Sequence, residues 1–196
     1  MTAYAQRSSL DDFASSRAAL VLAFAWGLAE ATFFFIVPDV LLTLIACRAL
    51  KPAVNATVAT LAGALIGGAL MCALGSSDAQ FARIALDRIP AISPELIARV
   101  GDQIDQSGFL AVMFGPIKGI PYKIYAVEWG ARHDNLLTFL LISIPARYIR
   151  FLLAAAAARI IARLIEPLTR HRATIEASIL ALVWLGFYTF YFTRFG

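Results

Sequence analysis

The chain has 196 residues, of which 60% are hydrophobic and 15% are charged, with a mean hydropathy of +0.75 and a net charge of +4. Soluble domains are roughly 45–50% apolar and about 25% charged, so the composition excludes an ordinary soluble domain. It predicts a single all-α polytopic membrane domain, whose basic loops face anionic lipid headgroups rather than a nucleic acid.

Residues 18–47 form an apolar run that is too long for one straight crossing. It follows a polar start of 17 residues that does not have the pattern of a cleavable signal peptide. As one helix, 30 residues would extend about 45 Å, whereas a hydrocarbon core is about 30 Å thick. Glu30, Pro38 and Asp39 interrupt the run. These features predict a re-entrant hairpin bent near Phe33–Pro38, with Asp39 as an alternative N-cap of its second arm.

Residues 53–75 predict a spanning helix, and residues 78–107 predict amphipathic helices at the membrane interface. The spanning helix carries small residues at spacings of four, a pattern by which membrane helices pack closely; they include Gly63, Gly67, Gly68 and Gly75. In 78–107, apolar residues recur every three or four positions. Ser93 followed by Pro94 is a helix start, with Ser93 as the N-cap.

Residues 109–130 predict a second broken segment, followed by two more spanning helices. Two glycines and two prolines fall within seven positions, and such irregular backbone is tolerated at membrane depth only inside protein or beside water; they are Gly115, Pro116, Gly119 and Pro121. Residues 136–158 predict a spanning helix with a kink at Pro145, and residues 159–172 a basic loop or helix end. Residues 174–193 predict a final spanning helix with an interfacial belt of aromatic residues.

The order of a broken segment followed by a spanning helix occurs twice along the chain. Opposed re-entrant segments of this kind form the sites of many transporters near the membrane midplane. Counts of lysine and arginine favour a cytoplasmic N-terminus whether the broken segments are re-entrant or cross fully, so that choice stays open. The oligomeric state also stays open, with a homo-oligomer among the options.

Charged residues within the apolar segments are the strongest indication of function. Six of them lie well inside these segments: Glu30, Asp39, Lys118, Lys123, Arg147 and Arg150. Unpaired at membrane depth, they would together cost on the order of 15–20 kcal/mol. One interpretation is structural ion pairing, but two acids neutralise only two of the four bases. The excess of cations indicates an anion, and a lipid phosphate is the nearest candidate.

The two groups of charges predict different tasks. Lys118, Lys123, Arg147 and Arg150 are the candidate binding residues for the phosphate, and Glu30 and Asp39 are candidate proton-coupling residues. Glu128 is interpreted as an interfacial group outside the site. We expect no catalytic set, no cofactor and no metal site, because no nucleophile, nucleotide or metal-ligand pattern occurs. Cys47 and Cys72 lie in apolar runs and predict no disulfide framework.

The broken segments resemble those of DedA-type proteins, also called SNARE-associated or VTT-domain membrane proteins. Glu30 to Leu42 is similar to that family's first hairpin, with an acid, a hydrophobic turn, a proline and a second acid. The stretch Phe114 to Lys123 is similar to its basic hairpin, with lysines in place of the two arginines. The resemblance implies two opposed re-entrant hairpins and a place in the bacterial inner (cytoplasmic) membrane. It also implies translocation of a phospholipid or polyprenyl phosphate, with proton coupling as an option.

Two other functions stay open from the sequence. The same hairpins could serve a proton-coupled secondary transporter of small ions or anionic solutes. Alternatively, the charges could be structural pairs in a membrane scaffold that transports nothing.

Overall fold

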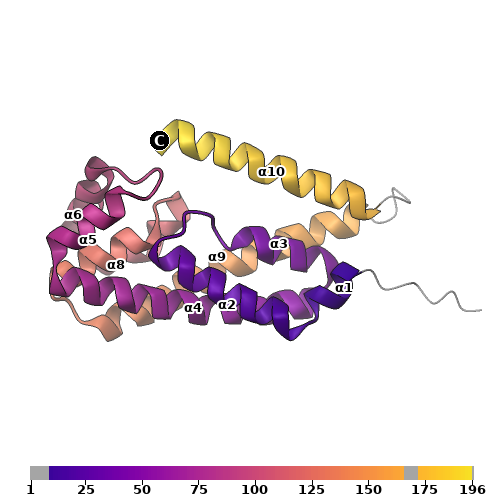
Figure 1. Cartoon of the computed structure of the whole chain (residues 1–196), viewed down its shortest axis with the longest axis horizontal. Coiled ribbons are helices and arrows are strands. Elements are labelled where there is room, and N and C mark those ends of the chain that lie inside the picture. The colour runs from indigo at the N-terminus through magenta and orange to yellow at the C-terminus, as the bar shows by residue number, and fades with distance from the viewer. Residues whose placement is uncertain (1–8, 166–171, 196) are drawn as a thin grey trace, which may run out of the picture.

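The structure is a computed structural model that describes residues 9–165 and 172–195. Within these ranges every regular element is a helix and no strand occurs, so the all-α prediction is confirmed. Three of the described helices are long and apolar enough to cross a membrane, which confirms an integral membrane architecture: α4 (Leu50–Ser77), α9 (Leu136–Ile165) and α10 (Arg172–Phe195). They contain the three predicted spanning segments (Figure 1).

The first broken segment folds as two short helices that enter and leave at the same end of the molecule (Figure 1). A one-turn helix, α1 (Ser9–Ala14), precedes α2 (Arg17–Thr32), and α3 (Asp39–Arg48) returns. Ser16 caps α2 by accepting a hydrogen bond from the Ala19 N–H at 3.2 Å. With 16 residues, α2 rises only about 24 Å, which is less than a hydrocarbon core of about 30 Å. The chain therefore turns back as a hairpin at residues 33–38.

Helix α4 is the packing centre of the molecule, and its glycines allow two neighbours to approach. A Cβ atom at Gly63 would lie 2.0 Å from the carbonyl oxygen of Phe24 in α2. On another face of the helix, a Cβ atom at Gly75 would lie 2.2 Å from the carbonyl oxygen of Val127. The predicted small-residue pattern is thus a packing feature. Its partners include glycines that the sequence did not single out, because Gly27 also contacts the backbone of α4.

The hydrophilic stretch forms two helices, α5 (Ala79–Asp87) and α6 (Pro94–Ser107). Ser93 is the N-cap of α6, as predicted, and accepts a hydrogen bond from the Leu96 N–H. The apolar face of α6 is buried against other helices of the chain rather than free to lie on lipid. A helix packed on protein and a helix lying on lipid show the same periodicity, so the interfacial position of this helix stays a prediction.

The second broken segment comprises α7 (Phe109–Phe114), the 3₁₀ turn η1 (Pro116–Lys118) and α8 (Tyr122–Ala131). Arg132, just after α8, donates to Asp105 of α6 at 2.7 Å and to Glu128 at 2.9 Å. Its hydrogen bond holds the pKa of the Asp105 carboxyl below the usual value. These contacts attach α6 to α8 at the end of the molecule opposite the first hairpin (Figure 1).

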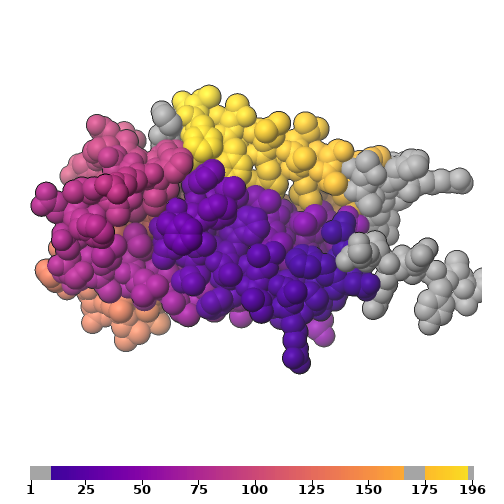
Figure 2. Space-filling model, in the orientation of Figure 1, coloured from indigo at the N-terminus to yellow at the C-terminus, as the bar shows by residue number. Residues whose placement is uncertain are grey.

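Helices α9 and α10 complete the fold. α9 continues to Ile165 without interruption at Pro145, so Arg159 and Arg163 are helical, which fits the helix-end alternative for the basic segment 159–172. Residues 166–171 of this segment lie outside the described residues. Helix α10 runs along one side of the molecule and packs against α3 and α9 (Figures 1 and 2). It is peripheral, since only 6% of its most apolar 18-residue stretch is buried, whereas 44% of the corresponding stretch of α4 is buried.

Candidate functional site

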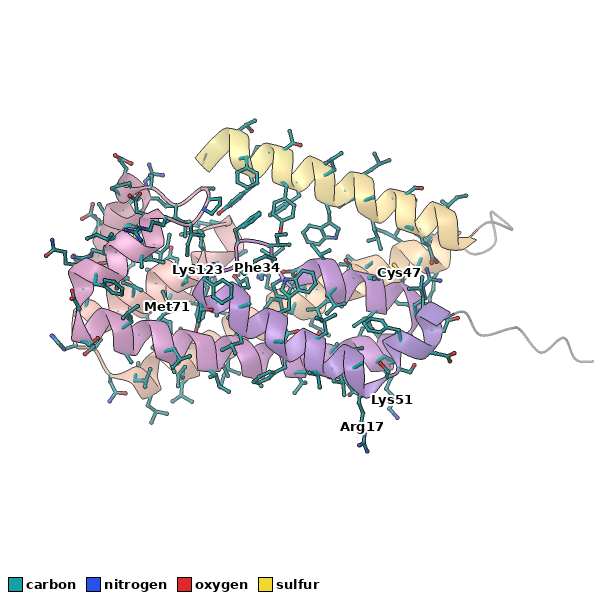
Figure 3. The ribbon with its side chains drawn as sticks, in the orientation of Figure 1. Arg17, Phe34, Cys47, Lys51, Met71 and Lys123 are labelled. Carbon is teal, nitrogen blue, oxygen red and sulfur yellow. The ribbon has the colours of Figure 1, made fainter. Side chains whose placement is uncertain are left out.

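The tips of the two broken segments meet in the middle of the molecule. Lys123 at the start of α8 donates from Nζ to the carbonyl oxygen of Phe34, in the turn of the first hairpin, at 2.7 Å (Figure 3). That turn is held from two sides. Trp26 donates to the carbonyl oxygen of Ile36 at 3.0 Å, and the Tyr188 hydroxyl accepts from the Val37 N–H at 2.8 Å.

Glu30 of the first hairpin and Arg147 of α9 form a buried ion pair. The Arg147 Nη2 donates to Glu30 Oε2, and both side chains are almost entirely shielded from solvent. The guanidinium carbon of Arg147 also lies 4.2 Å from the ring centre of Tyr122, which is an attractive cation–π geometry. The Tyr122 hydroxyl donates to Ser143 at 3.0 Å. The pair therefore links α2, α8 and α9.

Asp39 and Arg150 form a second ion pair, with Nη1 and Oδ2 2.9 Å apart. The alternative interpretation of Asp39 as an N-cap is wrong. Pro38 occupies the cap position of α3, and no side-chain cap hydrogen bond forms there. Asp39 is instead the first helical residue, where the positive end of the helix dipole favours a carboxylate. Its side chain points to α9 because α3 packs along that helix.

A cavity of about 360 Å³ lies where these groups converge. Five of the six charged residues singled out in the sequence line it: Glu30, Asp39, Lys123, Arg147 and Arg150. Two carboxylates and three cations leave one positive charge in excess at the cavity when all are ionised. Aromatic residues of α10 form one wall: Trp184, Phe187, Tyr188 and Tyr191. Trp184 also donates to Thr43 of α3 at 3.2 Å.

Arg147 and Arg150 each keep a donor that no described residue of the chain uses. The Nε atoms of Arg147 and Arg150 are buried and have no hydrogen-bond acceptor within the described part of the chain. A buried donor without an acceptor costs about 1–3 kcal/mol. An anionic ligand in the cavity is the type of group that would satisfy such donors.

Lys118 lies apart from the other five charges. In η1 the side chain of Pro116 is buried, whereas those of Ile117 and Lys118 are exposed. A 3₁₀ turn advances about 120° per residue, so residues two apart face different directions. The turn ends at Gly119, whose φ of +88° reverses the chain. The structure therefore places Lys118 at the surface, outside the residues that line the cavity.

Glu128 belongs to a different cluster. It accepts hydrogen bonds from Arg83 at 2.7 Å and from Arg132 at 2.9 Å, and it lines a separate pocket of about 470 Å³ beside α5 and α6. This location agrees with its interpretation as a group outside the site. The described residues contain no cluster of His, Cys, Asp and Glu side chains placed to hold a metal ion.

The aromatic contribution to the cavity was not predicted from the sequence. The aromatic residues of α10 were interpreted as an interfacial belt, yet several of them face the charged groups. A signal was present, because Trp184, Tyr188 and Tyr191 recur at helical spacing and share one face of α10. Tyr122, which stacks on Phe139 with ring centres 5.4 Å apart, carried no such signal.

Comparisons with protein-family models, with curated proteins and with solved structures found no match to this chain.

Proposed function

We propose that the chain is a membrane lipid translocase that moves a phosphate-bearing lipid, such as a phospholipid or a polyprenyl phosphate. The observation that carries the proposal is the cavity at the hairpin tips, with its excess positive charge and two buried arginine donors that have no acceptor there. A phosphate supplies both the charge and the acceptors. Membership of the DedA-type family is part of the proposal, supported by the motifs around Glu30, Asp39 and Lys123.

In this proposal the cations have different roles. Lys123 is a mobile point charge that exchanges the Phe34 carbonyl for a phosphate oxygen. Arg147 and Arg150 are held by their carboxylate partners and present the unused Nε donors. Lys118 is outside this set because its side chain is exposed.

Proton coupling, where it operates, would act through the carboxylates. Asp39 competes with an incoming phosphate for Arg150, and Glu30 does so for Arg147. A proton on either carboxylate removes its charge and frees the arginine for the lipid. The affinity for the lipid therefore increases as the pH falls, and the lipid is released more readily as the pH rises.

The proposal includes a location and an orientation. We place the chain in a bacterial inner (cytoplasmic) membrane with its N-terminus in the cytoplasm. The support is the distribution of lysine and arginine, since cytoplasmic loops carry an excess of both. Phosphate-bearing lipids and protons are then the partners. A homo-oligomer is compatible with this arrangement, and the cavity itself is formed within one chain.

The test is translocation of a labelled phospholipid by the purified full chain in vesicles. The wild-type chain should move lipid faster than protein-free vesicles, and Lys123→Met, Arg147→Ala and Glu30→Ala should each reduce the rate at least tenfold. Lys118→Met is the matched control, since it removes a lysine of the same hairpin that the structure places at the surface. Asp39→Asn should bind lipid with a weaker pH dependence than the wild type, because only the pair of Glu30 and Arg147 then responds to protons.

Three outcomes would contradict the proposal. Wild-type translocation no faster than that of Arg147→Ala would overturn it. Uptake of inorganic phosphate or another small anion, driven by a pH gradient and without lipid movement, would favour a secondary transporter. Full activity of the charge-swapped pair Glu30→Arg with Arg147→Glu would favour a scaffold, in which the charges only pair.

A further inference from the structure

An apolar groove lies beside the charged cavity, between α3, α9 and α10. Its volume is about 220 Å³, and its lining is almost entirely apolar. The floor is a run of alanines on α9 at spacings of three and four: Ala154, Ala157, Ala158 and Ala162. Because these side chains are small, the face of α9 is a trough rather than a ridge. Helix α10 forms the opposite wall with Val183, Trp184 and their neighbours.

The groove and the charged cavity adjoin each other. Ala154, Val183 and Trp184 line both of them. The hydrogen bond from Trp184 to Thr43 lies at this junction, since Thr43 also lines the groove. A ligand placed across the junction would thus meet cations at one end and hydrocarbon side chains at the other. That distribution matches an amphiphile and not a small soluble anion.

The length of the groove matches a lipid chain. From Ala154 to Ile165, the residues of α9 that line it rise about 16 Å. Half of a hydrocarbon core is about 15 Å thick, which is the depth that one acyl chain covers in its leaflet. The far end is marked by Glu176, which is buried and paired with Arg48 at 2.9 Å. An ion pair there makes a polar end to an apolar channel.

We propose that this groove binds one hydrocarbon chain of a lipid whose phosphate lies among Lys123, Arg147 and Arg150. The inference rests on the proposed function and adds to it a binding site for the chain, together with a basis for selecting chain length. The charged cavity recognises the phosphate, and the alanine-lined groove distinguishes a lipid from free phosphate. Chains longer than the groove gain nothing from their additional carbons.

The experiment measures binding of alkyl phosphates of increasing length to the detergent-solubilised full chain by calorimetry. Inorganic phosphate and methyl phosphate are the reference ligands without a chain. Burial of a methylene increases affinity by up to about fourfold, and partition into micelles reduces this gain equally for every variant. In the wild type, affinity should therefore rise with chain length and then level off.

Two variants separate the groove from the rest of the helix surface. Ala157→Phe fills the groove at a position whose side chain is exposed, so the core does not need to move. It should bind long alkyl phosphates at least tenfold more weakly than the wild type and methyl phosphate equally well. Leu153→Phe adds an aromatic ring at an exposed position of α9 outside the groove, and should match the wild type for every ligand.

The outcomes distinguish this inference from the proposed function. If Ala157→Phe binds long alkyl phosphates as well as the wild type does, the groove is not the chain site and the inference is wrong. If the wild type binds all ligands with equal affinity, the ligand is a free anion and the inference also fails. If Lys123→Met binds every alkyl phosphate as tightly as the wild type, the phosphate site itself is wrong, and the proposed function fails with it.

Discussion

Arg147 takes part in several separate interactions at the centre of the site. It pairs with Glu30, lies over the ring of Tyr122 and keeps Nε free of any acceptor in the described chain. Placing a charged group at the centre of a membrane helix costs roughly 2.5–3.5 kcal/mol. A single favourable interaction would do little more than offset this cost. Tyr122 and Glu30 together hold the guanidinium in one orientation. In that orientation the Nε atom is buried and has no acceptor among the described residues.

Removing one partner of this pair should destabilise the chain more than removing both charges. Arg147→Met leaves the Glu30 carboxylate buried and unpaired, which typically costs about 3–5 kcal/mol. The double variant Glu30→Gln with Arg147→Met should recover most of that loss, because no uncompensated charge remains. Thermal unfolding in detergent measures the difference. Equal losses in the single and double variants would show that the pair contributes through packing and not through charge.

The sequence predicted the composition of the site better than its geometry. Charge inside apolar segments was sufficient to find Glu30, Asp39, Lys123, Arg147 and Arg150. It could not exclude Lys118, because the rotation of a 3₁₀ turn decides which side chains face inward. The sequence also could not predict which acid pairs with which base. Glu30 meets Arg147 across a separation of 117 residues, which only the packing of α2, α8 and α9 establishes.

At the scale of elements, α2 and α4 are held together by close backbone contact. Neither Gly27 of α2 nor Gly63 of α4 has room for a Cβ atom. Such an atom at Gly27 would lie 2.2 Å from the carbonyl oxygen of Thr60, and one at Gly63 would lie 2.0 Å from that of Phe24. Such contact gives van der Waals attraction along the helices without any large side chain. The first hairpin is therefore fixed against α4 at its α2 arm, while its α3 arm packs along α9.

Gly63→Ala should separate α2 from α4 and destabilise the chain by about 1–3 kcal/mol. The new Cβ atom would lie 2.0 Å from a backbone oxygen, which cannot rotate away as a side chain can. Gly186→Ala in α10 is the matched control, because a Cβ atom there meets nothing within 4 Å. It should be neutral or stabilise by up to about 1 kcal/mol. Unfolding temperatures of the two variants test the comparison, and equal shifts would contradict it.

Helix positions were predictable, but the environment of each helix was less so. Apolar length predicted α4, α9 and α10. The excess length of 18–47, together with Pro38, predicted the break at residues 33–38, and the cluster of proline and glycine predicted the break at 115–121. The periodicity of α6 predicted an apolar face without showing whether lipid or protein covers it. For α10, aromatic content indicated an interface, whereas the packing turns Trp184 and Tyr188 toward the cavity. Whether lipid or protein covers a helix face depends on the neighbouring helices, which the local sequence pattern does not indicate.

For the whole molecule, the hairpins define which segments share a side of the membrane. Asp12 and Lys51 flank the first hairpin and should lie on the same side, because α2 and α3 return to one end. Asp102 in α6 should lie on the opposite side, because α4 separates it from Lys51. All three side chains are exposed, so single cysteines at these positions should react with membrane-impermeant reagents.

Labelling of single cysteines in sealed vesicles tests this arrangement. The background carries Cys47→Ala and Cys72→Ala, since the native cysteines are buried and their removal leaves only the introduced thiol. We expect Asp12→Cys and Lys51→Cys to react from one side and Asp102→Cys from the other. Asp12 and Lys51 reacting from opposite sides would mean that the first segment crosses the membrane completely.

The ion pair between Glu30 and Arg147 also has a consequence for how the chain is made. Synthesis at about 5–20 residues per second means that Arg147 emerges roughly 6–23 s after Glu30. Asp39 waits a similar time for Arg150. During biogenesis the first hairpin thus carries two acids whose partners do not yet exist, and it must keep them protonated or in contact with water. Its final placement in the bilayer is a late event of assembly, completed only when α9 arrives.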